Sequence, residues 1–183
     1  MHVLARLLMA GLLALAGLTA LSGGSAHADS PLADCPGYAQ QDFNPGMKLL
    51  PQNITFHAEG DFGPCLTAAL DPDHAFASYQ AGGSGTLSCL VSLPVSGVSG
   101  TVAWKSTSGN NTGTSHFSGG ISLTERPTGQ NVVIVVADIT SGPFAGRKLV
   151  YEIALLNTDL AACATTNGLQ TVAGPANLTV LPL

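Results

Sequence analysis

Glycine and proline divide the chain beyond residue 29 into short runs that alternate between apolar and polar residues. In Asn53–Ala58, for example, Ile54, Phe56 and Ala58 share one face, and two polar residues take the other. This two-residue period is that of a strand, and no 3.6-residue apolar stripe persists long enough for a long helix. The sequence therefore predicts an all-β fold, an antiparallel β-sandwich or open barrel of about seven to eight strands.

The individual strands and turns follow from the same pattern. We expect strands at Asn53–Ala58, Gly85–Leu93, Thr101–Lys105, Ser115–Leu123, Asn131–Ile139, Lys148–Leu156 and Gln170–Leu181. Asn131–Ile139 is nearly all apolar and β-branched, which predicts the most buried strand, covered on both faces. Turns are expected at Gly82–Gly85, Gly97–Gly100, Ser108–Asn111, Pro127–Gly129 and Ser141–Pro143. A short helical turn, limited by Pro72, is expected within Leu66–Tyr79.

The first 28 residues carry the pattern of a secretory signal peptide. One Arg precedes an apolar run of 15 residues, Leu7–Leu21, and a small polar segment then ends in Ala26-His27-Ala28. The Ala-x-Ala motif predicts cleavage after Ala28. Because a membrane-spanning helix needs roughly 20 apolar residues, the run predicts no span in the mature form. We therefore expect one secreted domain over residues 29–183, a length that suits a single core.

Export makes disulfides the expected state of the four cysteines, Cys35, Cys65, Cys89 and Cys163. Their spacing contains no C-x-x-C, which disfavours a zinc site or a redox pair and predicts two structural bridges. The sequence leaves three connectivities open. We favour Cys35–Cys89 with Cys65–Cys163, and give nearly equal weight to a Cys65–Cys89 bridge.

The charge of the chain argues against two classes of partner. Six Lys and Arg stand against eleven Asp and Glu, giving a formal net charge of −5, and only Arg147 and Lys148 form a basic pair in the mature part. Nucleic-acid binders and proteins that bind membranes electrostatically need clusters of basic residues. We expect neither activity here.

The order of several short segments resembles a family of exported, β-rich actinobacterial proteins of unknown function with four cysteines. The matching segments are Cys35 with Phe43–Met47, Asn53–Gly60 leading to Cys65, Ser84–Cys89, Gly100–Trp104, Gly113–Ser115, Thr140–Gly146, and Cys163 with Gly168–Leu169. The resemblance covers nearly all of the mature chain, and Gly142–Gly146 before a strand is its most distinctive part. It implies a secreted β-domain with disulfides, and it carries over no catalytic residue.

Hydrolytic and metal-dependent chemistry has weak support in the sequence. A triad needs a nucleophile, a His and a carboxylate in contact, but there is no G-x-S-x-G motif, and Ser115 and His116 point to opposite faces of a strand. We expect His57, His74 and His116 at solvent-facing strand positions or in loops. The segment Asp71–His74 lacks the Gly and Glu of a calcium loop and predicts a turn start at Asp71.

Two further groups of residues have a functional and a structural interpretation. Glu59 and Asp61 have the make-up of a glycosidase carboxylate pair, but a solvated turn after a strand is the simpler prediction. Trp104, Tyr38, Tyr79 and Tyr151 are the aromatic residues of a possible sugar- or peptide-binding face; since Trp104 is alone in its strand, we expect it in the core. No phosphate-loop pattern is present.

These observations predict a secreted, non-enzymatic β-domain with no catalytic residues, metal or cofactor, which binds a cell-wall or extracellular protein or glycan. The alternatives are a small secreted hydrolase with a cryptic site and a secreted protease inhibitor with a rigid loop between disulfides. An enzyme is expected to show a pocket where His and carboxylate side chains converge.

Overall fold

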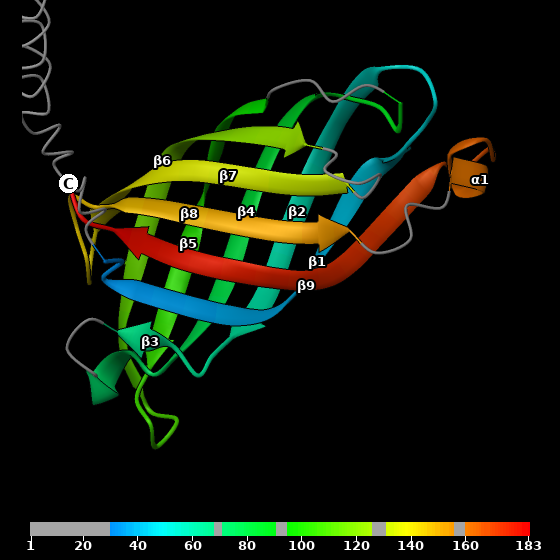
Figure 1. The fold of residues 1–183 in the computed structure, drawn as a ribbon. Helices are drawn as coiled ribbons and strands as arrows, with labels where there is room; N and C mark the ends of the chain where they lie inside the picture. The colour runs from blue at the N-terminus through cyan, green and yellow to red at the C-terminus, as the bar shows by residue number, and fades with distance from the viewer. Residues whose placement is uncertain (1–29, 68–70, 91–94, 126–130, 156–159) are drawn as a thin grey trace, which may run out of the picture.

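The computed structural model describes residues 30–67, 71–90, 95–125, 131–155 and 160–183 (Figure 1). The predicted signal peptide and the predicted turn at Pro127–Gly129 lie outside these residues. The elements in chain order are β1 (Ala33–Met47), β2 (Gln52–Phe62), β3 (Leu66–Thr67), the 3₁₀ helix η1 (Pro72–His74), β4 (Phe76–Leu87), β5 (Val95–Lys105), β6 (Asn111–Glu125), β7 (Asn131–Ser141), β8 (Lys148–Leu155), the single-turn helix α1 (Leu160–Cys163) and β9 (Leu169–Leu181).

Eight of these strands form one closed antiparallel barrel. The order around the sheet is β2-β4-β5-β6-β7-β8-β9-β1, and β1 pairs with β2 to close it. The short β3 adds only to β1. The predicted all-β antiparallel class is confirmed, and of the two arrangements left open the chain adopts the barrel. Its two ends are named here after η1 and α1, which lie at opposite ends in Figure 1.

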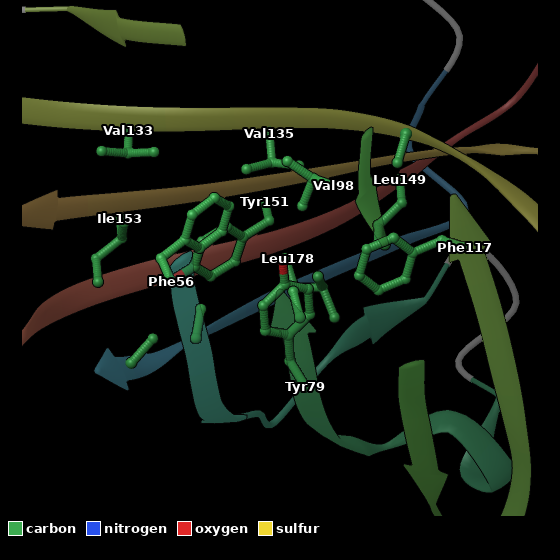
Figure 2. Packing of buried hydrophobic residues seen from close by; sticks show 14 of the residues in the cluster. Phe56, Tyr79, Val98, Phe117, Val133, Val135, Leu149, Tyr151, Ile153 and Leu178 are labelled. Carbon is green, nitrogen blue, oxygen red and sulfur yellow. The ribbon is translucent and has the colours of Figure 1, made fainter. Parts of the chain in front are cut away.

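The barrel interior is filled by side chains from all eight strands (Figure 2). At its centre the Tyr79 ring stacks between Phe117 and Tyr151, with ring centroids 5.5 and 4.4 Å away, and Phe62 meets both tyrosines edge-on. In small barrels interior positions are packed in layers by alternate strands, and here β4, β6 and β8 supply the stacked rings. Trp104 is fully buried, so its predicted place in the core is confirmed.

Inward-facing glycines make room for these rings. A Cβ on Gly83 would lie 2.8 Å from Phe56 Cζ, and one on Gly60 would lie 2.9 Å from Phe62 Cε2. The prediction of turns at Gly82–Gly85 and Gly97–Gly100 is therefore wrong, because both segments lie inside strands, β4 and β5. The predicted turns at Ser108–Asn111 and Ser141–Pro143 do connect β5 to β6 and β7 to β8, and the short helical turn is η1.

Strand β7 corrects a second expectation. Val133 and Val135 point into the barrel and are buried, but Val136 faces outward and is 38% exposed. The strand is thus covered on one face rather than on both, since every strand of a closed barrel has an inner and an outer side.

The longest strand missed by the sequence is β1. Its Cys-Pro-Gly and Asn-Pro-Gly triplets are typical turn signals, yet the strand runs through them and pairs with β9 and β2. The predicted strand Gly85–Leu93 is also misplaced: β4 ends at Leu87, Cys89 lies beyond it, and residues 91–94 are outside the described residues.

The two predicted disulfides are present, but the favoured pairing is wrong. The bridges are Cys35–Cys65 and Cys89–Cys163. The first follows from register, because the Asp34–Leu66 pair of β1 and β3 places Cys35 opposite Cys65, with a Cα–Cα distance of 4.1 Å. The second ties the end of β4 to α1.

Candidate binding groove on the outer face of the barrel

The outward-facing residues of β1, β2 and β4 are almost all polar and form a continuous band that we call the polar strip. Strand pairing sets them in rows, so that Tyr38, Asp61 and Ser78 lie side by side. The next rows of paired residues along the strands continue the band. The polar strip consists of Tyr38, Gln40, Asp42 and Asn44 from β1, Asn53, Thr55, His57, Glu59 and Asp61 from β2, and Ser78, Gln80, Gly82, Ser84 and Thr86 from β4.

The strip is hollowed near the η1 end. This hollow, of about 530 Å³, is lined by outward side chains and by the backbone of residues whose side chains turn inward; its lining is Tyr38, Ala39, Gln40, Glu59, Gly60, Asp61, Ser78, Tyr79 and Gln80. We call it the Tyr38 hollow. Tyr38 is 58% exposed, so much of its side chain is accessible to a ligand.

Hydrogen bonds hold one edge of the Tyr38 hollow and leave the other free. Ser78 Oγ donates to Asp61 Oδ1 (2.7 Å), and Lys105 Nζ donates to Ser78 Oγ (2.8 Å). Among the described residues, no hydrogen bond is made by the Glu59 carboxylate or by the Gln80 amide. The hollow thus presents a carboxylate and an amide whose hydrogen-bonding groups are available.

A second hollow lies at the other end of the strip. It measures about 460 Å³ and is lined by Asn44, Pro45, Asn53, Ile54, Thr55, Ser84 and Gly85. Thr86 Oγ1 donates to Asn53 Oδ1 (3.1 Å) beside it. We call it the Asn53 hollow. The row of Asp42, His57 and Gly82 separates the two hollows, which therefore share one polar surface running along the strands.

The polar strip carries negative charge. Asp42, Glu59 and Asp61 belong to it, and none of its members is Lys or Arg. The cation that reaches it, Lys105, comes from the neighbouring β5 and is directed to Ser78. A surface of this kind repels polyanions and offers hydrogen bonds to ligands that carry no negative charge.

The predicted histidine positions are partly confirmed. His57 and His116 are exposed on the outer faces of β2 and β6. His74 is neither on a strand nor in a loop, because it is the last residue of η1, and it is half-buried and paired: its Nδ1 lies 2.6 Å from Asp71 Oδ2. No described contact joins any two of the three histidines.

The surroundings of His74 close the η1 end of the barrel. Its ring packs on Trp104 and Phe144, with centroids 5.5 and 4.9 Å away. The Asp73 backbone N–H donates to Asp71, and this bond, together with the one from His74, holds the pKa of the Asp71 carboxyl below its usual value. Asp71 therefore starts the turn, as predicted.

Ser115 is occupied by structural contacts. Its Oγ accepts a hydrogen bond from Trp104 Nε1 (2.8 Å) and donates one to the Pro143 carbonyl. Ser115 is buried and His116 exposed, so their predicted opposite orientation is confirmed. The serine hydroxyl is committed to holding Trp104 and the Gly142–Gly146 turn.

The predicted turn at Glu59 and Asp61 is wrong, because both residues lie within β2 and share its outer face. Of the four aromatic residues proposed for a binding face, Tyr38 alone is on the surface, since Tyr79, Tyr151 and Trp104 are buried. The sequence analysis missed Gln40, Ser78 and Gln80. Their alternation with buried residues was a usable signal, but it needed β1 and β4 to be identified as strands.

In the part of the chain that the structure describes, no three His, Cys, Asp or Glu side chains gather in a way that suits a metal ion. Across the same residues, no helix combines the length and the apolar character that crossing a membrane requires. The chain matches no model of a protein family, no curated protein and no solved structure.

Proposed function

We propose that this protein is a secreted, non-enzymatic binding domain whose polar strip contacts a cell-wall or extracellular partner. The observation that carries the proposal is the contrast between a barrel interior filled by packed side chains and an outer face that is hollowed twice and lined by available polar groups. Two disulfides are compatible with an extracellular location.

The arrangement of the ionisable groups supports binding over catalysis. Among the described residues, the side chains of the His74–Asp71 pair hydrogen-bond no serine, threonine or cysteine side chain. Ser115 is bonded to Trp104 and Pro143 instead. The carboxylates of the strip lie on an open surface, whereas general acid catalysis usually relies on a carboxyl group in a water-poor environment. Binding to an open, rigid sheet face needs neither feature.

The proposal is tested by sedimentation of the mature protein with the insoluble wall fraction, and by crosslinking to proteins of the medium, from the secreting organism. We expect retention by the wild type and loss on Glu59→Lys, which places a cation in the Tyr38 hollow. Glu152→Lys is the matched control, because Glu152 is exposed on the outer face of β8.

Equal retention of both variants would place the binding surface elsewhere. Failure of the folded wild type to bind any wall, glycan or protein component would overturn the proposal. Release of reducing sugar or peptide by the wild type would replace it with the hydrolase alternative.

A further inference from the structure

The polar strip has the shape and chemistry to hold a chain molecule lying along the strands. We propose that its ligand is a linear, neutral oligosaccharide that spans both hollows, an inference that rests on the proposed binding function and names the ligand class. The β2 residues from Asp61 to Asn53 rise by about 26 Å at the usual spacing of a strand, so the strip exceeds the length of a single sugar.

The polar groups of the strip match a ligand rich in hydroxyl groups. Sugar hydroxyls both donate and accept hydrogen bonds, and the Glu59 carboxylate and Gln80 amide offer acceptors and donors that the described protein leaves unused. The exposed Tyr38 beside them supplies an aromatic ring, which suits stacking on the C–H face of a sugar ring, and a hydroxyl that can hydrogen-bond. Asn53 and Ser84 supply the same kind of polar contact in the second hollow.

The alternatives of similar length fit less well. A nucleic acid or an acidic polysaccharide would meet Asp42, Glu59 and Asp61 with no Lys or Arg in the strip. An extended peptide usually binds by adding a strand to an exposed sheet edge, but the barrel closes the edges of β1, β2 and β4 against one another and their neighbours.

The test is titration of the full mature domain, followed by backbone amide NMR, with four neutral tetrasaccharides: cello-, malto-, manno- and N-acetylchitotetraose. Tri-galacturonate is the anionic comparison. We expect at least one neutral probe to shift amides of β1, β2 and β4, and to bind about tenfold or more tightly than its own monosaccharide. The anionic probe is expected to bind more weakly than the neutral one.

Variants assign the contacts. Tyr38→Ala is expected to weaken binding by about tenfold or more, the loss of an aromatic anchor, while Tyr38→Phe keeps the stacking and stays within about threefold. Gln80→Ala is expected to weaken binding, and Gln170→Ala, an exposed glutamine of β9 outside the strip, is expected to leave it unchanged.

Two outcomes would overturn the inference. One is that no neutral probe shifts any amide at millimolar concentration; the other is that the shifts fall outside the strip. If the wild type is nevertheless retained by the wall fraction through its Glu59 face, the proposed function stands and only the ligand class fails. Tighter binding of tri-galacturonate would likewise overturn the neutral ligand.

Discussion

The β1–β2–β4 wall and the β7–β8 wall of the barrel are alike inside and different outside. Both bury apolar side chains along the axis, for example Phe56 from β2 and Val135 from β7. On the outer surface, the first wall carries the polar strip, whereas β7 and β8 carry Val132, Ile134, Val136 and Val150. The alternation that builds the fold thus leaves the outer residues free to differ.

This difference shows where fold and function are encoded in a closed barrel. Inner positions are fixed by packing, since a ring such as Phe117 stacks on Tyr79 and needs Gly100 opposite, where a Cβ would lie 2.8 Å from Phe117 Cζ. Outer positions of the same strands tolerate any polar residue. Folding therefore does not require the particular carboxylates, amides and hydroxyls that they carry. The four predictions below test this division.

The largest effect is expected from a charge on the inner face of β7. Val135→Asp places a carboxylate among packed apolar side chains with no partner, which we expect to cost more than about 4 kcal/mol and to prevent folding. Val136→Asp, one residue away on the outer face, is expected to cost about 1 kcal/mol or less. Circular dichroism and urea unfolding measure both, and equal losses would contradict the inner–outer division of this strand.

The two walls differ in how well the sequence predicts which residues face inward and which face outward. Alternation within Asn53–Ala58 and the apolar residues of Asn131–Ile139 were enough to locate β2 and β7, and the burial of Trp104 was predicted. The uniform composition of β7 hid its outer face, because Val and Ile also occur at outward positions. Of the strip, the sequence analysis considered Tyr38, Glu59 and Asp61 only as candidates, and it predicted the two carboxylates in a turn.

The missing information is non-local. Whether β1 continues through Pro36 and Pro45 depends on pairing with β9, which is more than 120 residues away in the chain. The glycines of β4 resemble a turn until Phe56 of β2 is placed opposite Gly83. The disulfide pairing follows from the contact of β1 with β3, a two-residue strand with no sequence pattern of its own.

The two disulfides are expected to differ because they close chain loops of different length. Cys35–Cys65 fastens β1 to β3, while Cys89–Cys163 links the end of β4 to α1, which follows β8. Their sequence separations are 30 and 74 residues. The chain-entropy model gives about 3.6 and about 4.4 kcal/mol as their upper contributions.

Replacing each pair by alanine is therefore expected to destabilise the domain, and more so for Cys89→Ala with Cys163→Ala. Urea unfolding of the two double variants and the wild type provides the ranking. A larger loss for Cys35→Ala with Cys65→Ala would show that anchoring β1 to β3 matters more than the length of the closed loop.

A smaller effect is expected at the glycines beneath the strip. A Cβ at Gly60 would lie 2.8 Å from Ala39 Cβ and 2.9 Å from Phe62 Cε2, so Gly60→Ala overpacks the interior and is expected to cost about 1–3 kcal/mol. Gly82 faces outward, and its nearest neighbour would be the Phe56 carbonyl oxygen at 3.3 Å. We expect Gly82→Ala to change the free energy of unfolding by about 0.5 kcal/mol or less. Thermal melts of both variants test this, and a Gly60→Ala protein as stable as the wild type would refute tight packing under the Tyr38 hollow.

The smallest effect at neutral pH is expected where the two walls meet, at Tyr79 from β4 and Tyr151 from β8. Both hydroxyls are buried without a hydrogen-bond partner among the described residues, so replacing either tyrosine with phenylalanine loses no bond. We expect Tyr79→Phe and Tyr151→Phe to change the free energy of unfolding by less than about 1 kcal/mol at pH 7.

At high pH the same pair becomes a source of instability. Burial raises the pKa of Tyr79 well above its usual value, with the neighbouring Tyr151 adding to the shift, and burial raises the pKa of Tyr151 as well. The unfolded chain releases these protons from about pH 10, whereas the folded barrel retains them, so the contribution is present below pH 10 and lost as the pH rises. The limiting slope is about 1.4 kcal/mol per pH unit for each tyrosine. Urea unfolding at pH 8, 10 and 11 is expected to show this loss in the wild type, and a smaller loss in the double phenylalanine variant. Parallel losses in the two proteins would mean that the hydroxyls reach water, and that the two walls do not seal the stacked pair at the centre of the barrel.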